Sequence, residues 1–141
     1  MAPESLIRLS DGLLAADKLA PGDIALAVIG RNHLLESTEV TDLVHLSDQH
    51  FFSVTASNKT IKASAEMKLL SFTKQGKYYQ NHFLSIKDLA IGDLLAVVSG
   101  KHLSFTAISE IVAAGQGPVI IPVLGPGDEN NFIADGFVTK P

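Results

Sequence analysis

The sequence contains no cysteine. This absence excludes a disulfide framework, a thiolate metal site and a cysteine nucleophile together. It does not fix the cellular compartment, because a protein without disulfides can fold in any of them.

The sequence also lacks clusters of basic residues and long apolar stretches. Eleven Lys and Arg face 15 Asp and Glu, a formal net charge of −4, and the basic residues are scattered. Extensive nucleic-acid binding is therefore not expected, since it needs clustered cations. The longest apolar runs, 24–29 and 94–98, are far shorter than the roughly 20 residues that cross a bilayer, and no signal peptide is visible. We expect a cytoplasmic protein, or part of a virion or another assembly, without membrane contact.

What is present predicts one all-β domain over residues 1–141. Apolar residues make up 46% of the chain and charged residues 18%, as in folded proteins. Short apolar runs separated by turns predict many short strands. The predicted turns are 10–12, 21–23, 57–59, 75–77, 91–93, 115–118 and 125–128. Helix is expected only as single turns at 15–19 and 86–89.

The chain nearly repeats itself. The stretch Leu-Ala-Pro-Gly-Asp-Ile-Ala-Leu-Ala-Val at 19–28 aligns with Leu-Ala-Ile-Gly-Asp-Leu-Leu-Ala-Val-Val at 89–98, 70 residues later. In each copy Gly can take a positive φ and Asp can bond its own backbone, so the chain reverses into a buried strand. The repeat predicts two related halves, roughly 1–70 and 71–141.

The repeat and both chain ends resemble the Hint domains of inteins and hedgehog autoprocessing proteins. The paired Leu-x-x-Gly-Asp segments resemble that family's paired turns, and residues 1–12 resemble its first block. Residues 54–70 occupy the place of its Thr-x-x-His block. The closing Asn-Phe-Ile-Ala-Asp-Gly-Phe-Val-Thr-Lys-Pro at 131–141 is similar to its last block, Asn-Phe-Ile-Ala-Asn/Asp-Gly-Val-Val-x-His-Asn.

The resemblance implies a horseshoe of β-strands that brings both chain ends to one site. In the family a first Cys or Ser attacks the preceding carbonyl, and the Thr and His polarise and protonate the scissile peptide. In inteins a terminal Asn then cyclises with help from the penultimate His. No cofactor is implied.

The first catalytic positions are substituted here. Met1 stands at the nucleophile position, and its thioether has no ionisable proton. Ser64 and Met67 stand at the Thr and His positions, and Met67 cannot protonate a leaving amine. Ser5 is the nearest hydroxyl to the first position. It matches a small structural residue of the family rather than the nucleophile, so we treat it as a weak candidate.

The last catalytic positions are substituted as well. Lys140 and Pro141 replace the His-Asn pair, and Pro122 stands where many members carry an Asp. A prolyl ring has no side-chain amide to cyclise. The predicted protein is therefore a Hint fold that is not an enzyme.

Other polar residues favour structural interpretations. His45, Asp48 and His50 could bind a metal only if a turn at 47–48 brought them together, and we prefer a polar turn without metal. The isolated histidines are interpreted as solvent-facing. They are His33, His82 and His102. The 125–128 stretch lacks the Lys-Ser/Thr of a phosphate-binding loop.

An aromatic group suggests a contact surface. Tyr78, Tyr79 and Phe83 lie near Lys74 and Lys77 and could form an exposed edge that binds a protein partner. A homo-oligomer is compatible with such an edge.

Two functions remain in competition. The favoured one is a catalytically inactive structural or binding module of a larger assembly, for example in a phage particle. The alternative is an autoprocessing domain in an inactivated or excised form, which a gene encoding polypeptide on both flanks would favour. A third reading is that the vacated site has become a pocket for a small ligand.

Overall fold

The computed structural model describes residues 1–29, 34–75, 77–125 and 130–141. Its elements are almost all strands: β1 (Leu6–Leu9), β2 (Gly12–Ala15), β3 (Ile24–Ile29), β4 (Leu34–Ala56), β5 (Lys59–Ser64), β6 (Lys68–Gln75), β7 (Tyr78–Ser85), β8 (Leu94–Ser99), β9 (His102–Leu124), β10 (Phe132–Ala134) and β11 (Phe137–Lys140). Two single turns of 3₁₀ helix, η1 (Ala16–Lys18) and η2 (Ile86–Asp88), complete the described elements. Both helical turns lie where the sequence predicts them, and the all-β class is confirmed. Within the described ranges no helix is long and apolar enough to cross a membrane.

The two predicted Gly-Asp turns have the same geometry. Gly22 and Gly92 have φ values of 100° and 97°, which strongly favour glycine. The carboxylates of Asp23 and Asp93 each accept the backbone N–H three residues earlier, at 2.9 Å in both copies. The predicted duplication is therefore confirmed at the level of individual hydrogen bonds.

Each turn is fastened to one of the long strands. The N–H of Gly22 donates to the carbonyl of Val40, and the N–H of Val40 donates back to the carbonyl of Asp23, at 2.7 and 2.8 Å. The second copy repeats this exchange with Ile108, at 2.9 and 2.8 Å. Val40 and Ile108 are both buried, so the turns anchor β4 and β9 at matching core positions.

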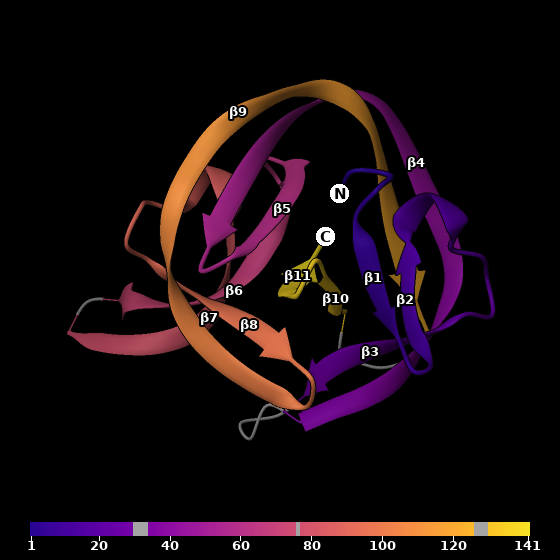
Figure 1. Ribbon diagram of the computed structural model, residues 1–141, viewed down its shortest axis with the longest axis horizontal. Coiled ribbons are helices and arrows are strands. Elements are labelled where there is room, and N and C mark those ends of the chain that lie inside the picture. The colour runs from indigo at the N-terminus through magenta and orange to yellow at the C-terminus, as the bar shows by residue number, and fades with distance from the viewer. Residues whose placement is uncertain (30–33, 76, 126–129) are drawn as a thin grey trace.

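The two anchored strands, β4 and β9, are 23 residues each and pair with one another antiparallel. Figure 1 shows them arching together around one side of the molecule, which gives the horseshoe outline. The prediction of uniformly short strands is wrong here, and so is the turn predicted at 115–118. Gly115 takes a φ of 86° within β9, and register shifts in the ladder absorb the irregularity as bulges without reversing the chain.

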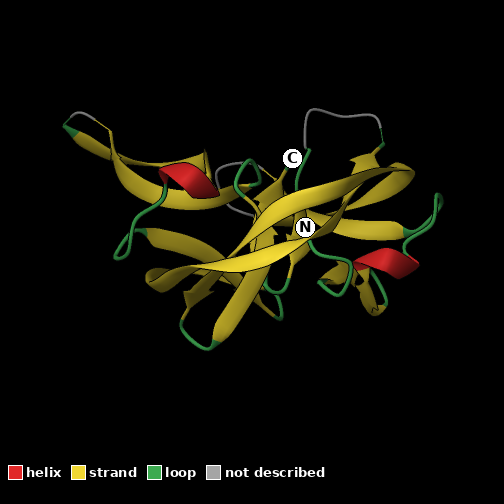
Figure 2. Cartoon of the chain, turned by 90° about the horizontal axis from the view of Figure 1, so that it is seen from above, coloured by secondary structure: helices red, strands yellow, loops and turns green. Residues whose placement is uncertain are grey.

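The remaining strands close around the chain ends. The order is β10-β1-β3-β4-β9-β8-β11-β6-β7, with β2 on β1 and β5 on β4. The short β10–β11 hairpin pairs with β1 on one side and with β6 and β8 on the other. It therefore joins the two halves of the fold. Figures 1 and 2 both place the N- and C-termini close together near the middle of the molecule.

The C-terminal hairpin and the N-terminal stretch contribute several of the largest side chains of the core. Phe132, Phe137, Met1 and Ile7 are among the largest fully buried side chains. Each such side chain stabilises the fold by about 1.5–3 kcal/mol through removal of apolar surface from water.

One buried amide supports this core. The Asn131 side chain accepts the Val28 N–H at 2.7 Å and donates to the Val28 carbonyl at 2.9 Å. It therefore satisfies both backbone groups of Val28 within the core.

Replacing Asn131 by Ala should lower the free energy of unfolding by about 2–4 kcal/mol, because two buried backbone groups would lose their partner. Urea denaturation measures this. Thr60→Ala, which removes an exposed hydroxyl pair with Thr55, is the matched control and should cost less than about 0.5 kcal/mol. Equal losses in the two variants would show that the amide does not support the core in this way.

Candidate functional site

The first residues of the chain are held between β9 and β5. The Met1 amino group donates to the Ile120 carbonyl at 3.3 Å, and the Ile120 N–H donates to the Met1 carbonyl at 3.0 Å. The N–H of Ala2 donates to the Lys62 carbonyl at 3.1 Å. Met1 is 0% exposed, so its thioether lies inside the core.

Burial changes the chemistry of the Met1 amino group. Its pKa falls from 8.0 to about 5, because the buried surroundings disfavour the ammonium form. At neutral pH the group is therefore an uncharged amine that donates to a backbone carbonyl.

The Ser64 to Met67 segment is a tight turn after β5. The Met67 N–H donates to the Ser64 carbonyl at 3.1 Å, and the Met67 carbonyl accepts the Ile86 N–H at 2.9 Å. The Met67 side chain is 3% exposed and belongs to the same apolar cluster as Met1. The fold thus brings residues 1 and 67, far apart in sequence, into one core.

The end of the chain lies beside this core. Lys140 pairs with Lys68 at the end of β11, and its Nζ lies 5.3 Å from the centre of the Phe83 ring. Pro141 is exposed. Pro122 is buried in β9, where it pairs with Leu43. It lies two residues after Ile120, whose backbone binds Met1.

Ser5 is part of a turn. Its N–H donates to the Ala2 carbonyl at 3.1 Å, and its own carbonyl accepts the Ala16 N–H at 2.8 Å. The residue is 3% exposed. Its backbone is thus fixed between the first residues and η1.

The 45–50 segment differs from the expected turn. Asp48 has a φ of 56° and lies at a bulge inside β4, where the register shifts between Leu46 and Gln49, so the chain continues without reversing. His50 Nε2 lies 3.0 Å from Gln116 Nε2. Nowhere in the described ranges do three His, Cys, Asp or Glu side chains gather as metal ligands would.

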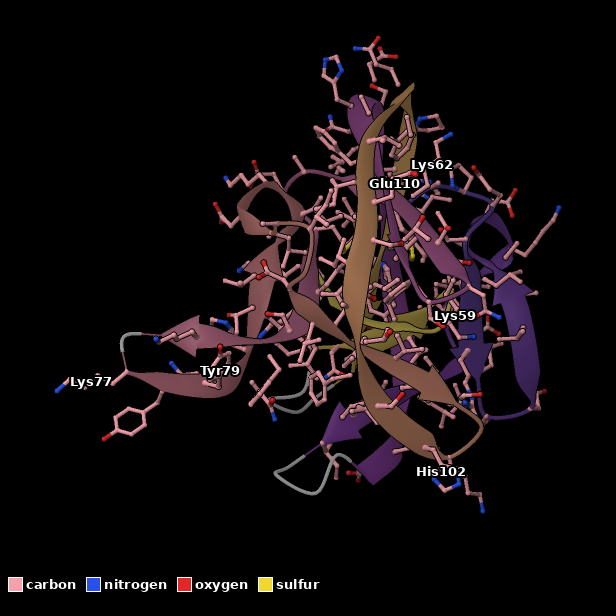
Figure 3. The ribbon with its side chains drawn as sticks, turned by 60° about the vertical axis from the view of Figure 1, so that its left-hand side comes forward. Lys59, Lys62, Lys77, Tyr79, His102 and Glu110 are labelled. Carbon is pink, nitrogen blue, oxygen red and sulfur yellow. The ribbon has the colours of Figure 1, made fainter. Side chains whose placement is uncertain are left out.

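The other singled-out residues are dispersed. The His82 ring contacts the Thr73 hydroxyl, and His102 is exposed at the turn between β8 and β9 (Figure 3). His33 lies outside the described residues, as do residue 76 of the 75–77 turn and residues 126–128 of the 125–128 turn.

The predicted aromatic surface is only partly exposed. Tyr78 and Tyr79 are 77% and 62% exposed on the β6–β7 hairpin, which projects from the body with Lys77 near its tip (Figure 3). The Tyr79 ring stacks on Phe72 with centroids 5.5 Å apart. Phe83 differs from expectation, because it packs partly buried against the second apolar cluster. The residues of β7 are thus exposed near the tip of the hairpin and half-buried near its base.

A surface cavity lies elsewhere. It has a volume of about 540 Å³, and none of the chain-end positions or residues 64 and 67 lines it. This cavity is therefore not the pocket that the sequence analysis considered at the vacated site. Its walls come from four hairpin turns. Our sequence analysis predicted two of them, at 10–12 and 57–59, and missed the turns at 100–101 and 135–136. The Asp-Gly pair at 135–136 is the signal that could have suggested one of the missed turns.

Comparison with known proteins gives a consistent result for the fold. No protein-family model and no curated protein sequence matches the chain. Among solved structures, a DnaB intein from Synechocystis sp. PCC 6803 is similar with a TM-score of 0.83 and 19% identity, covering 99% of this chain and 96% of that one. A DnaX mini-intein from Spirulina platensis has a TM-score of 0.78 and 12% identity, covering 100% and 98%. A bacterial intein-like domain from Clostridium thermocellum has a TM-score of 0.74 and 13% identity, covering 97% and 94%.

The buried amine predicts a pH-dependent stability. The unfolded chain binds a proton below about pH 8, whereas the folded chain binds it only below about pH 5, so stability should rise from pH 5 to pH 8 and then level off. The gain amounts to as much as about 4 kcal/mol, the equivalent of three pKa units. Denaturation of the free and N-acetylated proteins across this range isolates the effect, since acetylation removes the titrating group. Parallel pH profiles for the two would contradict it.

Proposed function

From the intein fold of the chain, we propose that this protein is a catalytically inactive Hint module that serves as a structural or binding part of a larger assembly. The observation that carries the proposal is the buried methionine at position 1, the place of the nucleophile in the resembled family. Its side chain fills the core where splicing chemistry would need a reactive thiol or hydroxyl.

The neighbouring positions support the same conclusion. Met67, at the place of the histidine, is buried among apolar side chains and has no proton to donate. Methionine fills irregular gaps well, which suits a centre that is packed and not reactive. Pro141 has no amide for the terminal cyclisation. Each step of the splicing route thus lacks its group.

The alternative is an intein-like autoprocessing domain in an inactivated or excised form. The fold supports this reading equally, since the structural neighbours include inteins. The scattered substitutions weigh against it. Met67 and Pro122 depart from the family pattern in addition to the two ends, whereas inactivation needs only one change.

For contact with a partner we propose the exposed end of the β6–β7 hairpin. Among the described strands, β7 ends the sheet and pairs with β6 alone. Its outer edge can therefore accept another strand, and Tyr78 and Tyr79 provide apolar area beside it. The partner is a protein, and a second copy of this chain is one form it can take. The proposed location is the cytoplasm or the assembly itself.

Fusion of the chain between two small tags tests the inactivity. After overnight incubation with and without thiol, intact mass spectrometry should show the unchanged fusion, because the groups that attack and protonate the junctions are absent. Release of a tag at the Met1 or Pro141 junction would overturn the proposal and direct attention to Ser5.

A restored variant provides the matched control for that experiment. It carries Met1→Cys, Met67→His, Lys140→His and Pro141→Asn in the same fusion. Cleavage in this variant alone would assign the inactivity to those four positions. Cleavage of the parent fusion to the same extent would contradict that assignment.

The contact surface has its own test. Tyr78→Ser together with Tyr79→Ser should reduce self-association, measured by sedimentation, at least tenfold, while the melting temperature falls by no more than about 5 °C, because both side chains are exposed and only the stack of Tyr79 on Phe72 is lost. Lys18→Ser, on the exposed η1 turn, is the control. Unchanged association of the tyrosine variant would remove the hairpin from the proposal.

A further inference from the structure

The surface cavity is enclosed by four turns that are distant in sequence. They are the β1–β2 turn with Ser10 and Gly12, the β4–β5 turn with Lys59 and Thr60, the β8–β9 turn with Ser99 and Gly100, and the β10–β11 turn with Asp135 and Gly136. At about 540 Å³, the cavity falls within the range typical of small-molecule sites.

Part of the inner surface of the cavity is apolar. Val98 and Ile133, which are 4% and 2% exposed, contribute to its lining from the core. Leu6 and Leu13 also line it, and they are 44% and 63% exposed. An apolar group placed here would cover surface that now faces water.

Two cations also line the cavity. Arg8 projects from β1 and Lys59 from β5, and both residues are half-buried. The ion pairs formed by described residues are Lys62–Glu4 and Lys87–Glu66, so neither Arg8 nor Lys59 has a carboxylate within 4.0 Å in the described ranges. Within the part of the chain that the structure describes, both positive charges therefore lack an anionic partner.

The glycine at 136 leaves room for one of these cations. A Cβ built on Gly136 would lie 2.7 Å from Lys59 Cδ and 3.2 Å from its Nζ. The lysine stem thus lies directly across the β10–β11 turn. Figure 3 shows Lys59 in the lower half of the molecule, next to the C-terminal strands.

The one acid among the described lining residues already has a role. Asp135 Oδ1 accepts the Leu6 N–H at 2.9 Å, and the Asp135 N–H donates to the Leu6 carbonyl at 2.9 Å. This pair of bonds holds β1 against the β10–β11 turn. With Arg8 and Lys59, the lining residues that the structure describes carry a net charge of +1, which suits a ligand with one negative charge better than a dianion.

We propose that this cavity binds a small organic monocarboxylate with an apolar body. The carboxylate would pair with the Arg8 guanidinium, which can donate two parallel hydrogen bonds, and with the Lys59 ammonium. The apolar body would cover Val98, Ile133 and the exposed leucines. The proposal does not depend on whether the chain end is inactive.

Isothermal titration with octanoate and with its neutral analogue octanamide tests the site. Octanoate should bind at least tenfold more tightly than octanamide, and its affinity should fall as salt is raised. Arg8→Gln and Lys59→Gln should each weaken octanoate at least fivefold and leave octanamide unchanged. Lys18→Gln, on the exposed η1 turn outside the cavity, should leave both ligands unchanged.

Three results would overturn the inference. They are equal binding of octanoate and octanamide, equal effects of the Lys18 and Arg8 variants, and tighter binding of inorganic phosphate than of octanoate. Thermal unfolding of each variant distinguishes a loss of binding from a loss of the fold. Because both glutamine substitutions are at half-buried surface positions, the variants should unfold within about 4 °C of the parent.

Discussion

The antiparallel pairing of β4 with β9 is the constraint on which the rest of the structure depends. The partners of Val40 and Ala56 in the ladder, Leu124 and Ile108, lie near opposite ends of β9. Isolated two-stranded hairpins are marginal in water, and the sheet grows from this ladder, with β3 and β5 paired to β4 and β8 paired to β9. The Gly-Asp turns fix where each half attaches, because they exchange backbone hydrogen bonds with Val40 and Ile108.

That framework determines the environment of the chain ends. Strands from both halves surround the β10–β11 hairpin and the first residues, so whatever stands at position 1 is removed from water. Polar groups in such a place need hydrogen-bond partners, and charged ones are disfavoured. The side chains of Met1 and Met67 are apolar, so they can be buried here without hydrogen-bond partners. The centre of the fold, where the two chain ends meet, is therefore packed with apolar side chains at these two positions.

Local features of the fold could be predicted from the sequence, and long-range ones could not. Gly22-Asp23 and Gly92-Asp93 were predictable because a positive φ and a self-bonded carboxylate are properties of adjacent residues. Gly115 and Asp48 were misjudged because the same residue types serve both turns and bulges, and only the partner strand decides which one forms.

The candidate sites show the same division. The placement of Met1 and Met67 in one core followed from a resemblance that spans the chain, not from spacing alone. Phe83 was expected at the surface with the two tyrosines, but it lies nearer the base of the hairpin, where the neighbouring apolar cluster buries part of it. The cavity could not be predicted, because Arg8, Lys59 and Asp135 meet only after four hairpins have been arranged in three dimensions.

The closeness of the two chain ends has a topological consequence. A short linker could join them and close the backbone into a ring, which would convert the buried Met1 amine into an ordinary peptide group. New ends could then be made at the exposed β4–β5 turn at Ser57 and Asn58, away from the core. The fold is thus suited to circular permutation, and its present ends are only one of the places where this β-framework can be opened.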